Sequence, residues 1–154
     1  MKLEGEYIFD GPREAVWELL RDPEVLVTAL PGARSLERVG ENEYEGDMHV
    51  RVGPVSGVFS GRIVMSEEVA PESYTMSVEG KGGLAFAKAT GDVQLIDRGD
   101  DTTLMKYVGE FQVGGKLVSV GQRLLDSVSK KMLRQGLDAL NEVLKERVAA
   151  QAEG

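Results

Sequence analysis

Apolar residues recur at every second position over most of this chain, and the spacing changes near the end to that of a helix. The alternation begins at about Ala33 and ends at Val113, and turn sequences rich in glycine and proline separate its segments. This pattern is typical of antiparallel strands that bury one face and expose the other. It predicts six strands, joined by short turns, in the middle of the chain.

Helices are predicted only before and after these strands. An opening strand at residues 3–9 is followed by residues 10–12 (Asp-Gly-Pro), which start one short helix, and by Asp22 and Pro23, which start a second. The second helix stops before residues 30–32 (Leu-Pro-Gly). After two glycines at 114–115, helical spacing over residues 117–148 predicts one long amphipathic helix.

The predicted fold class is therefore α+β, with a seven-stranded antiparallel sheet, two short helices after the first strand and a long C-terminal helix. The length of 154 residues fits one domain, placed at residues 1–148, and residues 149–154 are predicted to form a disordered tail. A long curved sheet around a single helix tends to enclose an apolar cavity. Such cavities bind small molecules.

Charge and composition exclude several kinds of function. The formal net charge of −8 argues against binding to a phosphate backbone and against strong electrostatic attraction to anionic lipid. A transient membrane contact through apolar side chains stays open. The chain has no cysteine, and it has neither a signal peptide nor an apolar run long enough to span a bilayer. We therefore expect a cytoplasmic protein.

No group of residues forms a recognisable catalytic centre, and we expect no metal ion or cofactor. His49 is the only histidine, and it falls on the polar phase of its strand, which predicts a surface position. The acidic pairs at 67–68 and 100–101 lie near predicted turns, where charges are usually solvated. Residues 114–116 (Gly-Gly-Lys) precede a helix and could hold an anion, but a break between strand and helix explains the glycines more simply.

The predicted inner face of the sheet carries unusually small residues. They are Gly46, Gly61, Ala85, Ala87, Ala89, Gly91 and Gly109. Such a face either lets the long helix approach closely or leaves room for a ligand. Because alanine and glycine fill a curved sheet poorly, we favour the cavity.

The sequence also resembles the carbon monoxide dehydrogenase G-subunit family. The resemblance rests on short motifs in a fixed order, namely those at 22–24 (Asp-Pro-Glu), 30–33 (Leu-Pro-Gly-Ala), 44–46 (Tyr-Glu-Gly), 52–54 (Val-Gly-Pro), 59–61 (Phe-Ser-Gly), 114–117 (Gly-Gly-Lys-Leu) and 121–124 (Gly-Gln-Arg-Leu). It implies a helix-grip fold of the START/Bet v1-like superfamily, with an apolar cavity between sheet and helix. It further implies an accessory role to a molybdenum hydroxylase of the carbon monoxide dehydrogenase type at the membrane, by handling a quinone or another lipid. The family supplies no catalytic residues.

Three hypotheses follow for the function. The first is a non-catalytic binding protein for an isoprenoid quinone or an acyl lipid, with Trp17, Leu26 and Leu30 at the entrance of the cavity. The predicted walls of that cavity are Met48, Phe59, Ile63, Tyr107, Phe111, Leu124 and Val128. The second is an enzyme of the cyclase or hydratase kind, for which Tyr74, Tyr107 and Arg62 are the candidate polar residues. The third is an interaction or assembly factor without a ligand.

Overall fold

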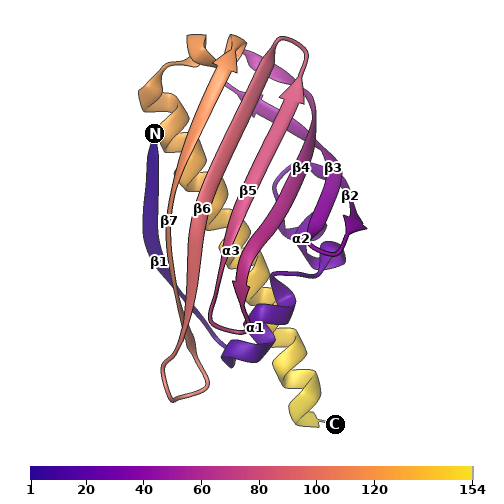
Figure 1. Cartoon of the computed structure of the whole chain (residues 1–154), viewed down its shortest axis with the longest axis vertical. Coiled ribbons are helices and arrows are strands. Elements are labelled where there is room, and N and C mark those ends of the chain that lie inside the picture. Colours follow the sequence, from indigo (N-terminus) through magenta and orange to yellow (C-terminus); the bar gives the residue numbers. More distant parts are fainter. Residues whose placement is uncertain (154) are drawn as a thin grey trace.

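A computed structural model describes residues 1–153 and confirms the predicted α+β architecture (Figure 1). Its elements in chain order are β1 (Lys2–Phe9), α1 (Arg13–Leu19), α2 (Pro23–Ala29), β2 (Ala33–Gly40), β3 (Glu43–Val52), β4 (Val55–Val69), β5 (Ser73–Gly82), β6 (Ala85–Asp97), β7 (Thr103–Gly115), the 3-10 helix η1 (Lys116–Val120) and α3 (Gln122–Glu153). The seven strands form one antiparallel sheet in the order β1-β7-β6-β5-β4-β3-β2.

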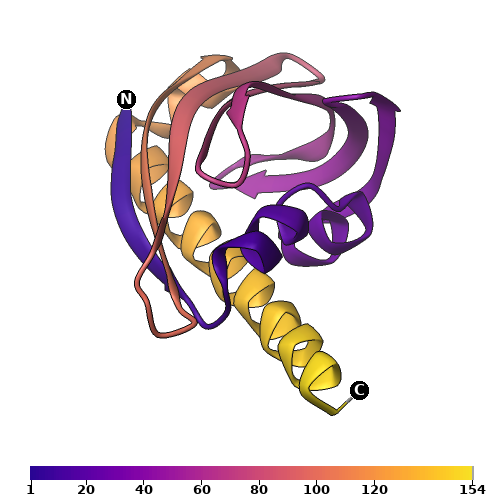
Figure 2. The same cartoon turned by 60° about the horizontal axis from the view of Figure 1, so that its bottom comes forward.

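Hairpins connect the strands from β2 to β7, so successive turns lie at alternate ends of the sheet (Figure 1). The β3–β4 and β5–β6 turns share one end with η1, and we call it the η1 end. The β4–β5 and β6–β7 turns share the opposite end with α1, which we call the α1 end. Turning the molecule shows α3 crossing the open side of the curved sheet (Figure 2).

The buried core is divided between these two ends. A large cluster at the α1 end joins α1, α2 and the second half of α3 to the sheet, and Phe9, Leu19 and Leu144 are fully buried there. A small cluster at the η1 end consists of Val52, Phe59, Ala85, Leu117 and Leu125. Each end of the molecule is thus closed by its own apolar packing.

Glycines on the inner face allow the sheet to curve. Gly46, Gly61 and Gly80 lie side by side across β3, β4 and β5, and Gly91 pairs with Gly109 across β6 and β7. Added Cβ atoms at these glycines would meet mainly the backbone of neighbouring strands, not α3. A Cβ on Gly109, for instance, would lie 2.8 Å from the Thr90 carbonyl oxygen. These glycines therefore permit strong bending between adjacent strands, which is a third explanation for the small residues on this face.

The C-terminal helix differs from its prediction in both limits. The helical segment that follows the sheet begins as η1, and Gly121, with φ 94°, separates η1 from α3. The predicted continuous helix from Leu117 is therefore two elements. At the other end α3 runs to Glu153, through residues predicted to be a disordered tail. The later start also sets the helix phase, so Leu125 is buried, whereas Leu124 is exposed.

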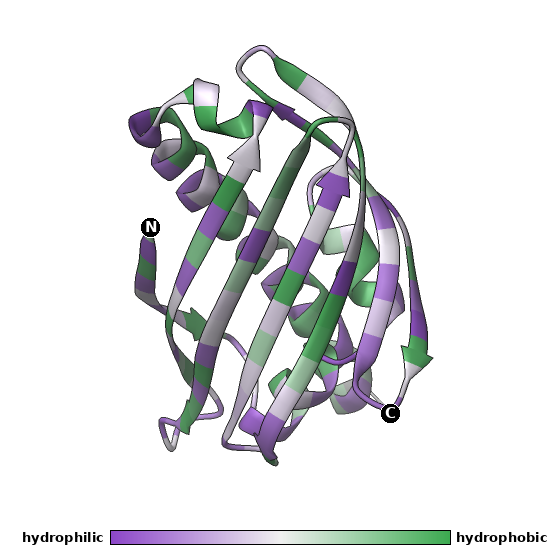
Figure 3. Cartoon of the chain, turned by 45° about the horizontal axis from the view of Figure 1, so that its top comes forward, coloured by the Kyte–Doolittle hydropathy of each residue, from purple (hydrophilic) through white to green (hydrophobic). Residues whose placement is uncertain are grey.

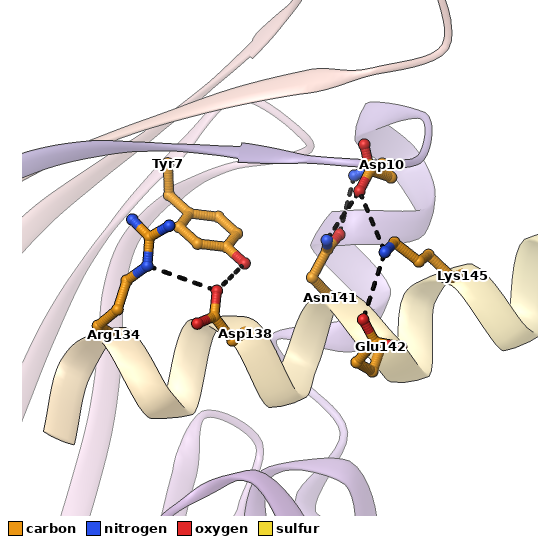
Figure 4. Close-up of polar contacts among 7 residues, drawn as sticks. All are labelled: Tyr7, Asp10, Arg134, Asp138, Asn141, Glu142 and Lys145. Carbon is orange, nitrogen blue, oxygen red and sulfur yellow. Dashed lines mark hydrogen bonds and ion pairs between the residues drawn. The ribbon is translucent and has the colours of Figure 1, made fainter. Parts of the chain in front are cut away.

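The start of α1 also differs from its prediction. Pro12 is the N-cap residue and not the first helical residue, and its side chain makes no capping hydrogen bond. Asp10, predicted to start this helix, binds α3 instead: the Asp10 backbone N–H donates to Asn141 Oδ1 at 2.9 Å, and Asn141 Nδ2 donates to Asp10 Oδ2 at 2.8 Å (Figure 4). The predicted cap of α2 is confirmed, since Asp22 accepts from the Glu24 backbone N–H at 3.0 Å.

Two further polar contacts hold α3 at the α1 end. The Tyr7 hydroxyl donates to Asp138 at 2.7 Å (Figure 4), and Arg147 donates to Asp22 at 2.7 Å. Arg147 is the main reason why the pKa of Asp22 lies below its usual value. Asp22 therefore joins α2 to α3 as well as capping α2.

The curvature argument predicts a strong effect at Gly46, where a Cβ would overlap the Ser35 carbonyl oxygen of β2. We expect Gly46→Ala to lower the free energy of unfolding by about 1–3 kcal/mol, the usual cost of forcing atoms into a packed site. Gly57→Ala is the matched control, because its added Cβ would meet nothing within 4 Å. Urea denaturation measures both variants. Equal stabilities would contradict the argument.

The Asp22 contact predicts a pH-dependent stability. Asp22→Asn keeps a capping side chain but loses the charge that pairs with Arg147, so we expect a loss below about 1 kcal/mol near pH 7. Because the folded-state pKa of Asp22 is lowered, the stabilisation is complete above the unfolded-state value of about 3.9 and is lost as pH falls through the folded-state pKa. Urea denaturation of wild type and variant should therefore converge at the acid end. A difference that is constant from pH 7 to pH 3 would rule out this explanation.

Candidate functional site

The concave face of the sheet bears no charged side chain on β3 to β7. Its residues, which alternate with exposed ones, are mainly aliphatic, aromatic or glycine. The exceptions with polar atoms are tyrosines and Thr103. The Thr103 hydroxyl donates to the Gly11 carbonyl at 2.8 Å, and the Tyr44 hydroxyl donates to the Arg21 carbonyl at 2.8 Å. Hydrogen bonds to the backbone thus satisfy both of these hydroxyls.

Burial along this face is high near the strand ends and lower between them. On β4, Phe59 and Met65 are buried, whereas Ile63 between them is only half-buried. The same change occurs on β6 and β7. We call the half-buried apolar side chains in the middle of the face the inner band; its members are Met48, Ile63, Met76, Val78, Ala87 and Ala89. Water reaches these side chains although they lie on the core side of the sheet.

The position of α3 explains why the inner band is only partly covered. The helix makes its main backbone approaches to α2, α1, β1 and β3, close to the two edges of the sheet (Figure 2). Its half-buried Val128 packs on the small cluster and its half-buried Leu133 on the large cluster. The helix therefore spans the curved sheet from edge to edge.

The structure divides the predicted ligand-binding residues into three groups. Trp17, Leu26, Phe59 and Phe111 are buried, and the first two belong to the large cluster, so they pack in the core at the predicted entrance. Those that are half-buried are Leu30, Met48, Ile63, Tyr107 and Val128.

Leu124, in contrast, is 41% exposed and lies beside Gly53 at the β3–β4 turn. It is therefore on the rim and not on a wall, and sequence reasoning missed Val78 and Ala89 as members of the inner band.

A polar cluster next to Trp17 was not predicted. Arg21 and Glu68 form an ion pair, each with a side chain only 21% exposed, and Arg21 also donates to Asn42 Oδ1 at 3.0 Å. The Arg21 guanidinium lies 5.6 Å from the Trp17 ring, and Tyr74 packs edge-on against that ring. Glu68 was expected in a solvated turn. Its pairing depends on a contact between α1 and β4, for which the local sequence contains no signal.

The candidate catalytic side chains do not form a reactive pair. Burial raises the pKa of the Tyr74 hydroxyl, which is therefore neutral at physiological pH. Tyr107 is half-buried beside Gly5. Arg62 is exposed on the convex face and pairs with Glu43 at 2.6 Å. His49 is exposed as predicted. The arrangement suits binding of apolar surface better than proton transfer.

Other surface features lie outside this face. Three shallow hollows occur on the molecule: one between the N-terminus and the start of α3, and two that are lined mainly by exposed residues of the sheet's convex side. Within residues 1–153, no cluster of acidic and histidine side chains has the arrangement of a metal site. None of the helices described is both long and apolar enough to cross a membrane.

Comparison with known proteins agrees with this geometry. Residues 5–145 match the family model of CoxG, described as the G subunit of carbon monoxide dehydrogenase. No curated protein matches the chain. A conserved protein from Geobacillus kaustophilus has a similar structure, with a TM-score of 0.89, 29% sequence identity, and coverage of 95% of this chain and 96% of that one.

Two more distant structures show the fold alone. One is a START superfamily protein from Mycobacterium smegmatis, with a TM-score of 0.71, 14% identity, and coverage of 94% of this chain and 97% of that one. The other is the Zhui aromatase/cyclase from Streptomyces sp. R1128, with a TM-score of 0.70, 15% identity, and coverage of 96% and 95%. The fold is therefore START-like, as the sequence resemblance implied.

The Arg21–Glu68 pair predicts a large difference between two adjacent residues. Glu68→Gln leaves Arg21 largely buried without its counter-charge, so we expect the free energy of unfolding to fall by about 1–3 kcal/mol. Glu67→Gln, at an exposed position, should change it by less than about 0.5 kcal/mol. Trp17 is the only tryptophan, so its emission should shift in Glu68→Gln alone. Identical spectra and stabilities would refute a supporting role for the pair.

Proposed function

Because the chain belongs to the CoxG family of carbon monoxide dehydrogenase and has a START-like fold, a combination commonly associated with hydrophobic ligands, we propose that it is a non-catalytic binding protein for a hydrophobic small molecule. The inner band carries this proposal: it is apolar, lies on the core side of the sheet and is still reached by water. Apolar surface in that position gains free energy when a ligand covers it. At roughly 25 cal/mol per Å², covering ~300 Å² contributes several kcal/mol before ordering costs.

The chemistry of the inner band favours a ligand with an uncharged head group. The concave face of β3 to β7 offers no cation to pair with a carboxylate. A fatty acid would have to keep its charge outside the sheet, because an unpaired charge is costly to bury. An isoprenoid quinone can place both ring and tail on apolar surface. Among quinones and acyl lipids, the quinone is therefore the better candidate.

The family membership supports a role as an accessory to a molybdenum hydroxylase of the carbon monoxide dehydrogenase type. In that role the protein would work in the cytoplasm and carry its ligand to or from the hydroxylase. A carrier must also reach the membrane that dissolves its ligand, at least transiently.

The ligand test compares two adjacent residues on opposite faces of β6. Ala89 belongs to the inner band, whereas Thr90 is exposed on the convex face. We expect Ala89→Phe to fill the inner band and to weaken binding of decylubiquinone at least about tenfold, as judged by quenching of Trp17 emission. Thr90→Phe should bind like wild type.

Native mass spectrometry of the purified protein, followed by organic extraction, identifies what the protein carries. A bound quinone or acyl lipid would support the proposal. A protein that is empty, and that stays empty after incubation with a lipid extract and with decylubiquinone, would refute it.

A further inference from the structure

Charge is segregated between the two ends of the molecule. Residues 48–66, 80–91 and 111–125 contain no aspartate or glutamate, although the whole chain has 26 acidic residues. The antiparallel connections bring the turns in these three segments together at the η1 end. The turns of the α1 end contain Glu72, Asp97, Asp100 and Asp101 instead. The net charge of −8 therefore conceals one end without acidic residues.

The η1 end also carries exposed basic side chains. Arg51 lies beside the β3–β4 turn, Lys81 ends β5 next to the β5–β6 turn, and Lys116 and Arg123 flank η1. Within the described part of the chain, none of these four forms an ion pair with a carboxylate. The nearest acid along α3, Asp126, is already paired with Lys130 at 3.1 Å.

Large apolar side chains are exposed among these cations. Leu84 is 72% exposed and Val118 is 61% exposed, the two highest values among the large apolar residues of this chain. They belong to adjoining segments, because the Lys116 backbone N–H donates to the Leu84 carbonyl at 2.9 Å. Further exposed apolar residues of this end are Val58, Phe86 and Leu124. Figure 3 turns this end of the molecule forward.

Together these residues have the properties of a surface that binds a bilayer. Anionic phospholipids attract basic side chains at about 1 kcal/mol per Lys or Arg, and exposed leucine and valine gain energy on entering the interface. The attraction is local, since salt screens charges beyond about 8 Å at physiological ionic strength. Helix α3 alone has 32 residues, or roughly 48 Å, so the acidic turns of the α1 end lie far beyond that distance.

We infer that the η1 end docks on the surface of a bilayer that contains anionic phospholipids, with Leu84 and Val118 in the interface and Arg51, Lys81, Lys116 and Arg123 around them. The acidic α1 end then points away from the membrane. This inference refines the expectation from net charge, which argued against attraction to anionic lipid. It does not depend on which molecule the inner band holds.

Vesicle co-sedimentation of the full chain tests the inference. We expect binding to vesicles of about 30% phosphatidylglycerol in phosphatidylcholine, weakening as salt is added, and little binding to phosphatidylcholine alone. Lys81→Gln with Lys116→Gln should weaken binding about thirtyfold, from two lost cations. Leu84→Ser with Val118→Ser should also weaken it, because the interface loses its apolar contacts.

Matched controls change the same kinds of side chain away from the η1 end. They are Arg38→Gln with Arg98→Gln for charge, and Ile8→Ser with Ile96→Ser for exposed apolar residues. These controls should bind like wild type, and circular dichroism should show that all variants are folded. Failure of wild type to bind anionic vesicles at low salt, or equal losses in variants and controls, would overturn the inference.

The decylubiquinone assay separates this inference from the proposed function. Variants of the η1 end should bind decylubiquinone in solution like wild type while losing vesicle binding. Quinone binding without vesicle binding in the wild type would refute the docking alone. Vesicle binding without any ligand would refute the proposed function alone.

Discussion

The curvature of the sheet is the constraint on which the rest of this structure depends. Adjacent strands can bend sharply only where no Cβ meets the backbone of the neighbouring strand, and rows of glycine provide this at Gly46, Gly61 and Gly80 and again at Gly91 and Gly109. Because the sheet curves, one helix can reach both of its edges. The same curvature keeps the helix away from the central strands, so that the apolar inner band is left partly uncovered.

Closed ends and an accessible middle have different physical origins. The large cluster and the clamp around Asp10 and Asn141 fix the second half of α3, whereas the small cluster fixes its first half. A tightly filled middle would increase stability, because protein interiors usually reach high packing density. The half-buried inner band departs from that rule at the place where the family and the fold lead us to propose a ligand.

The antiparallel connections also separate charge. Every second turn lies at the η1 end, so a chain that keeps acidic residues out of alternate turns acquires one end that is apolar and basic. Such a molecule can be strongly acidic overall and still present a cationic surface. For a carrier of a membrane-soluble molecule, docking by this end would bring the small cluster and the near part of the inner band close to the lipid.

The sequence by itself determined the elements and their order, because periodicity, turn residues and the cap at Asp22 act within a few residues of one another. It also determined the apolar character of the inner face. Only the tertiary structure decided which parts of that face are buried, why its glycines are small, and that Glu68 pairs with Arg21. The exposure of Leu124 in place of Leu125 likewise followed from the break at Gly121. Each of these depends on contacts between residues far apart in the chain, whose distances are set by the curvature of the sheet.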